Sequence, residues 1–295
     1  MKIYKYAAID IGSNAIRLLI ANAIETEGNE PQYKKVSLIR VPIRLGKDVF
    51  STGVISEKNK KRMLDAMQAY KLLMKVHKTE KYMACATSAM REAENGLEIA
   101  SFIKKETGID IQIIDGAKEA KIISSTDLGK LTDGDKSYLY VDVGGGSTEL
   151  TFFSKGKVLV SKSYKMGTVR RLDKKKAKDT YKEMKKWIKI HRQGLGKIHL
   201  IGSGGNINSI FKRSGHKLEK PLSYIYLKAH YHFLKTMTYE ERISVLSLNP
   251  DRADVIIPAT KIYLSAMKWS GATKVYVPRV GLADGIIKSL HLGKV

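Results

Sequence analysis

The first fifty residues alternate between apolar and polar side chains in three runs, at residues 6–11, 16–24 and 33–41. Alternation with a period of two is typical of strands that bury one face. A glycine turn at residues 12–14 follows the first run, and a polar segment at residues 27–31 follows the second. We therefore expect a meander of three strands joined by tight turns.

Beyond residue 56 the apolar positions recur every three or four residues, which is the spacing of one face of an α-helix. Ser56 is suited to cap the first of these helices. Short apolar runs between the helices predict buried strands. Helices are expected at residues 56–77, 97–106 and 117–128, and strands at 82–86 and 111–114.

The second half of the chain repeats this order. Strands are expected at residues 138–143, 149–153, 157–164, 198–201 and 274–277, and helices at 174–193, at 205–212, over further segments up to 270, and at 282–292. Asp10 and Asp142 lie 132 residues apart, and each ends an apolar run before a glycine turn. An internal repeat of this size indicates two similar α/β domains, which we place at residues 1–121 and 122–295. We expect a mixed five-stranded sheet in each domain and an interdomain cleft.

Composition narrows the expected cellular location and the expected binding partners of the protein. The chain has 53 Lys plus Arg against 29 Asp plus Glu, a net charge of +24 that attracts polyanions such as nucleic acid, anionic membranes or polyphosphate. Cys85 is the only cysteine, which excludes an internal disulfide and a Cys-rich zinc site, fits a cytoplasmic location, and predicts a buried thiol. Asp10 and Arg17 interrupt the first apolar run, so neither a signal peptide nor a membrane span is expected.

Three glycine turns are candidates for binding phosphate. Backbone N–H groups in such turns can point at an anion, and the carboxylates of Asp10, Asp142 and Glu149 beside two of them suit a divalent ion. The third turn, Gly204-Gly205, joins a strand to a helix, whose N-terminus favours an anion. A purely structural hairpin or strand–helix turn is the alternative for each. No Walker A loop or dinucleotide-binding glycine motif is present.

These segments resemble the signature turns of the exopolyphosphatase and guanosine pentaphosphatase (Ppx/GppA) family, within the superfamily of actin, sugar kinases and the Hsp70 ATPase. The most specific string is Gly-Gly-Gly-Ser-Thr-Glu-Leu at residues 144–150. Segments 9–17, 87–91, 114–120 and 201–205 match in the same order, so the resemblance covers nearly the whole chain. It implies two ribonuclease H-like (actin-like ATPase) domains and removal of a terminal phosphate from polyphosphate, pentaphosphate alarmone, or both.

The resemblance also implies roles for single residues. It places the family's catalytic glutamate at Glu119, its cleft arginine at Arg91, and metal and phosphate residues at Asp142, Gly144 and Glu149. A glutamate can orient and deprotonate a water, and an arginine can bind two phosphate oxygens. Expected phosphate-binding residues are Gly12, Ser13, Asn14, Arg17, Arg91, Gly144, Gly145, Gly146, Ser147, Gly204 and Gly205; expected ligands of Mg²⁺ or another divalent cation are Asp10, Asp142 and Glu149.

Three departures from the family pattern bear on this transfer. Ala15 stands where many members have Ser, and Lys118 stands where an acidic residue often precedes the catalytic one. The segment at residues 280–285, which contains Ala283 and Asp284, only loosely resembles the Leu-Arg-Glu-Gly often found near the C-terminus. The last departure mainly concerns the part of the expected site that would bind the nucleotide of the pentaphosphate alarmone.

The segment at residues 170–192 contains eleven basic residues against three acidic ones. A solvated helix face is one interpretation, and a surface for the distal part of a long polyanion or for nucleic acid is the other. Trp187, Ile188 and Met184 are expected to form a core stripe of this helix. His230 and His232 diverge around a helix, so we do not expect them to share a metal ion.

The sequence therefore predicts a Mg²⁺-dependent exopolyphosphatase that attacks the terminal phosphoanhydride with a water in the interdomain cleft. Hydrolysis of guanosine pentaphosphate (pppGpp) and phosphoryl transfer to an acceptor are the enzymatic alternatives. A polyanion-binding protein without turnover is the alternative of another class. Nucleic acid is not expected as the specific ligand, because its binding would require neither paired glycine turns nor Glu119; the oligomeric state is left open between monomer and homodimer.

Overall fold

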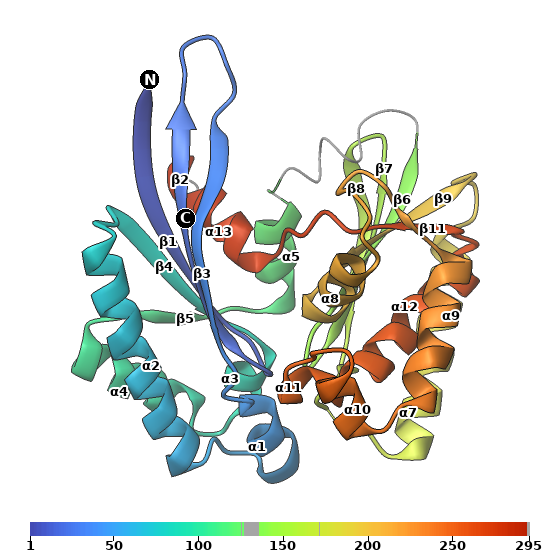
Figure 1. Cartoon of the computed structure of the whole chain (residues 1–295), viewed down its shortest axis with the longest axis horizontal. Helices are drawn as coiled ribbons and strands as arrows, with labels where there is room; N and C mark the ends of the chain where they lie inside the picture. The colour runs from blue at the N-terminus through green and yellow to red at the C-terminus, as the bar shows by residue number, and fades with distance from the viewer. Residues whose placement is uncertain (125, 127–135, 171, 294–295) are drawn as a thin grey trace. The chain divides into compact units, whose positions relative to one another are not determined.

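The computed structural model describes residues 1–124, 126, 136–170 and 172–293 (Figure 1). It divides into two compact units, Met1–Thr126 with Val280–Val295, and Asp127–Arg279. The C-terminal segment thus belongs to the first unit, although it follows the second in sequence. The domain boundary expected near residue 121 stays a prediction, as does the cleft between the domains.

Sheet A, in the first unit, has five strands in the order β3-β2-β1-β4-β5. The first three strands form the expected antiparallel meander, and β4 and β5 join it in parallel. Their bounds are β1 Lys2–Ile11, β2 Ile16–Glu25, β3 Gln32–Val41, β4 Lys81–Ala86 and β5 Ile111–Ile113. The helices of this unit are α1 Leu45–Thr52, α2 Glu57–Val76, α3 Ser88–Glu92, α4 Gly96–Thr107, α5 Gly116–Ser124 and α13 Leu282–His291.

The two faces of sheet A have different roles. On β1, Ala7, Ile9 and Ile11 belong to a buried apolar cluster with side chains from α2 and α4. Because side chains alternate along a strand, Asp10 points to the other face. Helix α13 packs against β1, β2 and α5. The charged residue at the end of β1 therefore lies outside the apolar cluster.

Sheet B, in the second unit, has six strands in the order β10-β11-β9-β6-β7-β8. The five expected strands are present, and the sixth is the two-residue strand β10, which is too short to show a period in the sequence. The strands are β6 Ser137–Val143, β7 Thr148–Ser154, β8 Lys157–Tyr164, β9 Ile198–Ser203, β10 Leu222–Ser223 and β11 Lys274–Tyr276. The helices are α7 Lys174–His191, α8 Gly205–Arg213, α9 Tyr224–Thr236, α10 Tyr239–Ser244, α11 Pro250–Ala253 and α12 Ile256–Ser270.

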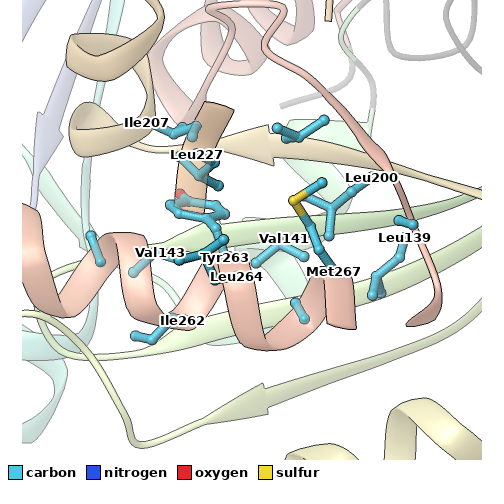
Figure 2. Packing of buried hydrophobic residues seen from close by; sticks show 14 of the residues in the cluster. Leu139, Val141, Val143, Leu200, Ile207, Leu227, Ile262, Tyr263, Leu264 and Met267 are labelled. Carbon is cyan, nitrogen blue, oxygen red and sulfur yellow. The ribbon is translucent and has the colours of Figure 1, made fainter. Parts of the chain in front are cut away.

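The core of the second unit lies between sheet B and its helices. Leu139, Val141 and Val143 on β6 pack with Tyr263 and Met267 of α12 (Figure 2). Met184, Trp187 and Ile188 of α7 are buried in the same cluster, so the expected core stripe of that helix is confirmed. Asp142, between two of the apolar residues of β6, points to the opposite face of the sheet.

The two sheets share their local arrangement at the first hairpin. In sheet A, Asp10 is the cross-strand partner of Arg17, and in sheet B, Asp142 is the partner of Glu149. Gly12 N donates to the carbonyl of Ala15 over 3.1 Å, and Gly144 N donates to the carbonyl of Ser147 over 3.0 Å. The internal repeat deduced from the sequence is confirmed at this level of detail.

The helix expected at residues 117–128 begins one residue earlier and is described as far as Ser124; residues 125, 127 and 128 lie outside the described residues. Helices α1 and α3 were not predicted, since each is too short for a clear helical period. Within the described part of the chain, no helix has the length and apolar character needed to cross a bilayer.

Candidate functional site

A row of polar side chains crosses sheet A at the level of Asp10. Strand pairing places Asp10 between Arg17 on β2 and Cys85 on β4. Arg17 Nη1 lies 2.7 Å from Asp10 Oδ2, and the Asp10 side chain is only 7% exposed. This ion pair offsets the cost of burying the carboxylate. The expected role of Asp10 as a metal ligand stays a prediction, because its carboxylate is bound by a guanidinium in this structure.

The turn after β1 is held from several sides. Ser13 Oγ and Ser88 Oγ are 2.9 Å apart, and both residues are buried. Gly46 N donates to the carbonyl of Ser13 over 2.8 Å, and Arg44 N donates to that of Asn14 over 3.1 Å. The starts of α1 and α3 therefore fix the conformation of the expected phosphate-binding turn.

Arg91 lies in the last turn of α3. Its Nη1 donates to the carbonyl of Ile114 over 2.7 Å. Ile114 directly precedes the segment that leads into α5, so this bond ties the arginine to the helix that carries Glu119. The guanidinium keeps further N–H groups, which is what a role in binding phosphate oxygens requires.

Glu119 lies in the first turn of α5 and is partly buried. Cys85 of β4 is completely buried, as predicted. Burial raises the pKa of Cys85 to about 12; the charges of Asp10 and Glu119 also raise it, and that of Lys118 lowers it. Asp10 is the strand neighbour of Cys85, and α5, which carries Glu119, packs on α13, which in turn packs on β1, so Asp10 and Glu119 lie on elements that α13 joins.

A second polar row crosses sheet B. Strand pairing aligns Ser203, Asp142, Glu149 and Ser163 on four adjacent strands. Ser203 Oγ donates to Asp142 Oδ2 over 3.2 Å, and Ser163 Oγ donates to Glu149 Oε1 over 2.9 Å. Glu149 is only 6% exposed. The two expected metal ligands of this unit therefore face each other across one strand pair.

This carboxylate pair fits a divalent cation. Like charges directly opposite each other in a sheet are unfavourable, and a cation between them would remove that cost. Among the described residues, no group of three or more His, Cys, Asp or Glu side chains is placed to hold a metal. Mg²⁺ is commonly bound by one or two carboxylates, with water and substrate phosphates completing its shell, so Asp142 and Glu149 suffice as protein ligands.

Tyr140 contacts the Asp142 carboxylate, and Tyr263 binds the backbone of Ser203, the strand neighbour of Asp142. Tyr140 Oη lies 3.3 Å from Asp142 Oδ2. Burial, followed by the charge of Asp142, raises the pKa of Tyr140. The pKa of Tyr263 is raised for the same two reasons, and its hydroxyl donates to the carbonyl of Ser203. Both phenols therefore stay protonated and act as hydrogen-bond donors beside Asp142.

The Gly144–Ser147 turn is held by the segment at residues 167–170. Thr168 N donates to the carbonyl of Gly144, and the backbone N–H groups of residues 169 and 170 donate to that of Gly145, over 2.8–3.1 Å. Arg170 Nε donates to the carbonyl of Gly146 over 2.7 Å. A Cβ on Gly167 would lie 2.3 Å from the Gly145 oxygen, so only glycine allows this approach. The turn is thus preorganised by bonds to its carbonyl groups.

The third glycine turn lies beside the second. Gly204 has a φ of 108°, and a Cβ there would lie 2.8 Å from the Val143 oxygen and 3.3 Å from Asp142 Oδ1. Helix α8 begins at Gly205, against which the guanidinium of Arg252 packs. The expected residues Gly204 and Gly205 are therefore neighbours of the carboxylate pair within the second unit.

Several residues at these sites were not singled out by sequence reasoning. They are Ser88, Ser163, Gly167, Arg170, Ser203 and Arg252. Ser163 and Ser203 could have been found from the strand register, since both pair with a predicted site residue. Ser88 lies within segment 87–91, which carries part of the family resemblance, and the other three depend on contacts between distant segments, for which the sequence carries no local signal. In the first unit, Asp10 and Arg17 pair at the ends of β1 and β2, next to the turn at residues 12–14, whereas Arg91 lies on α3 and Glu119 on α5. The expected residues of the second unit cluster around Asp142. That the two groups face one cleft stays a prediction.

The fold and these turns define a class of proteins with two related α/β units, each with a glycine turn after an aspartate-bearing strand. The chain belongs to the Ppx/GppA phosphatase family, whose family model matches residues 25–293. A solved structure of the Ppx/GppA family member from Aquifex aeolicus superposes with a TM-score of 0.78 at 25% identity and covers 99% of both chains. The expected two-domain actin-like fold and the expected family are confirmed.

Two curated relatives extend the comparison. The bifunctional 3-dehydroquinate synthase/phosphatase of Fusobacterium nucleatum is 29% identical over 295 residues, or 90% of this chain and 43% of that protein. Exopolyphosphatase 2 of Mycobacterium tuberculosis is 31% identical over 175 residues, or 58% of this chain and 54% of that protein. The chain spans about half the length of the curated relatives it matches.

Proposed function

We propose that this protein is an exopolyphosphatase, which hydrolyses the terminal phosphoanhydride bond of inorganic polyphosphate. The observation that carries the proposal is the carboxylate pair of Asp142 and Glu149, directly opposite each other beside the preorganised Gly144–Ser147 turn. Cation ligands beside an anion-binding backbone turn are suited to the hydrolysis of a phosphoanhydride. Exopolyphosphatase 2 of M. tuberculosis, a relative by sequence, supports the choice of substrate.

Each group has a part in the proposed reaction. Phosphoryl transfer requires neutralisation of charge on the terminal phosphoryl group and a water held in line with the bond that breaks. In the proposal, the backbone N–H groups of residues 145–147 bind phosphoryl oxygens, since that of Gly144 donates to the Ser147 carbonyl, and Arg91 binds two of these oxygens at once. Asp142 and Glu149 would hold Mg²⁺, which would supply further positive charge to these oxygens.

Glu119 is the proposed general base. It orients the water and accepts its proton while the water oxygen forms a bond to the terminal phosphorus. The bond from that phosphorus to the bridging oxygen breaks, and the bridging oxygen leaves with the shortened chain. Orthophosphate and a polyphosphate one unit shorter are the products, so atoms and charge balance without a further reactant.

Substitution of the base tests the proposal. Glu119→Gln keeps the size and polarity of the side chain but removes its basicity, so phosphate release should fall at least about 100-fold, the range of general-base effects. Binding of labelled polyphosphate should change little, because Gln still fits the site.

Glu106→Gln is the matched control, since Glu106 is an exposed glutamate in the last turn of α4. Both variants are assayed for phosphate release under the same conditions. An unchanged rate in Glu119→Gln, or an equal loss in both variants, would remove Glu119 from the proposed role.

A further inference from the structure

One face of α7 consists of lysines alone. Helix α7 runs from Lys174 to His191, and a residue advances by about 100° around a helix. At that spacing seven lysines fall within roughly 120° of the circumference, and no acidic residue falls among them. The seven are Lys174, Lys175, Lys178, Lys182, Lys185, Lys186 and Lys189, here called the lysine face.

The lysine face is exposed, and most of its positive charge has no acidic partner among the described residues. All seven side chains are exposed, whereas the buried residues of the helix lie on the other side. The acidic residues of α7 lie beyond the edge of the face: Asp179 is 3.7 Å from Lys182, and Glu183 pairs over 2.7 Å with Lys162 of β8. Among the residues that the structure describes, none of the other six lysines forms an ion pair. Such a concentration of like charge is stabilised by a polyanion.

The lysine face starts close to the glycine turn of the same unit. The side chain and backbone of Arg170 bind the carbonyl groups of Gly146 and Gly145. Lys174 follows four residues later, and four residues span at most about 14 Å. From Lys174 to Lys189 the face extends for about 22 Å along the helix axis. A polymer that has phosphoryl groups at the turn can therefore continue onto α7 if it is long enough.

The side chains of the helix argue against base recognition. Aromatic residues that stack on bases are characteristic of proteins that bind single-stranded nucleic acid. The aromatic residues of α7 are Tyr181 and Trp187; Trp187 is buried in the core, and Tyr181 packs against that core. The lysine face offers point charges only, which suits a flexible chain of phosphates without bases.

We propose that the lysine face of α7 is a binding surface for the distal part of a long polyphosphate whose end is at the Gly144–Ser147 turn. The inference rests on the proposed function for the identity of the polymer. It makes affinity depend on chain length, because a chain of a hundred units can cover the lysine face over its whole length of about 22 Å and a tripolyphosphate is too short to do so.

Neutralisation of four lysines tests the surface. In the variant Lys174→Gln, Lys178→Gln, Lys185→Gln and Lys189→Gln, glutamine preserves helix propensity and removes four charges. Fluorescence anisotropy then measures the Kd of labelled long polyphosphate and, by competition, of tripolyphosphate, at several salt concentrations. We expect the Kd of the long chain to rise at least about tenfold and the slope of log K against log salt to fall by about 3, in line with four lost phosphate contacts.

The matched control removes the same charge elsewhere. Lys58, Lys61, Lys71 and Lys75 are exposed lysines on α2 of the first unit. Their fourfold exchange to Gln should leave the Kd of the long chain within about twofold of the parent, because net charge alone acts weakly at moderate salt. The tripolyphosphate Kd should be unchanged in both variants.

Three outcomes would overturn the inference. The first is an equal loss of affinity for long polyphosphate in the α7 and α2 variants. The second is an equal loss of affinity for long and short chains in the α7 variant. The third is that duplex or single-stranded DNA competes for the protein as well as long polyphosphate does at the same phosphate concentration. Because the assay measures binding, it stays decisive if phosphate release is absent. Loss of the proposed hydrolysis with chain-length-dependent binding intact would refute the proposed function and not the lysine face.

Discussion

Asp10 lies where the sequence predicts it, at the end of a strand before a glycine turn, but its partner in the structure is not the predicted one. From the sequence, its place before a glycine turn predicts a cation ligand. In the structure its buried carboxylate is bound by Arg17, the cross-strand neighbour seven residues later. In the second unit the equivalent neighbour of Asp142 is Glu149. The repeat therefore conserves the position of the aspartate but changes the sign of the charge beside it.

Removal of Arg17 should destabilise the first unit. Arg17→Met keeps much of the side-chain volume and leaves the Asp10 carboxylate buried without its guanidinium. Since the Arg17 side chain is 33% exposed, water will offset part of the penalty, and we expect a loss of about 2 kcal/mol in the free energy of unfolding. Urea denaturation followed by circular dichroism measures it.

The double variant Asp10→Asn with Arg17→Met is the control for this prediction. It contains no buried unpaired charge, so it should be less destabilised than expected from the sum of the two single variants. Additive losses would mean that the ion pair contributes nothing to stability.

At the scale of elements, long periodic segments were predictable and close approaches were not. The strands of both meanders and the helices α2, α4 and α7 follow from hydrophobic period, because each buries one face over several turns or pleats. Helices α1 and α3 are too short to show a period. The approach of Gly167 to the Gly145 carbonyl joins segments that are separate in sequence, and no local pattern reports it.

Gly167→Ala should disturb the glycine turn of the second unit. A Cβ at this position would lie 2.3 Å from the Gly145 oxygen and 2.6 Å from the Gly146 carbonyl carbon, so the backbone must move. We expect a loss of about 1–3 kcal/mol in stability, as for other overpacked sites, with a raised KM for polyphosphate. Denaturation and initial-rate assays measure the two effects.

Gly281→Ala provides the comparison for this variant. Its φ is −160°, and a Cβ there would meet no atom within 4 Å. Stability and KM should both stay close to the parent values. If Gly167→Ala matched Gly281→Ala in both stability and KM, the close approach of Gly167 to the Gly145 carbonyl would not be required.

At the scale of the molecule, the sequence places α13 at the end of the second half, whereas the structure assigns it to the first unit. Ile286 and Ile287 of α13 are buried, and the helix packs on β1 and β2. Asp284 caps α13 through Gly281 N and pairs with Lys35 of β3 over 2.7 Å. The departure from the family pattern at this position thus has a structural role within the first unit. The hydrophobic period identified the helix. The unit to which it belongs depends on packing between segments that are far apart in sequence, and no local pattern reports that packing.

Ile286→Ala should therefore weaken the first unit selectively. Truncation of a buried isoleucine costs about 2–5 kcal/mol. Hydrogen exchange followed by mass spectrometry should show faster exchange in β1 and β2 than in the parent, with sheet B unchanged. Ile190→Ala, at a half-exposed isoleucine of α7, is the control and should alter neither sheet. Faster exchange in sheet B alone would contradict the assignment of α13.

The proposed activity is tested most directly by phosphate release from long polyphosphate, pppGpp and ATP at equal concentrations of cleavable ends, with Mg²⁺ and with EDTA. We expect Mg²⁺-dependent release from polyphosphate to exceed release from the two nucleotides at least about tenfold, and EDTA to abolish it. Faster release from pppGpp would make the alarmone the substrate. Tight binding of polyphosphate with no phosphate released under any condition would contradict the account, and would identify a polyanion-binding protein instead of an enzyme.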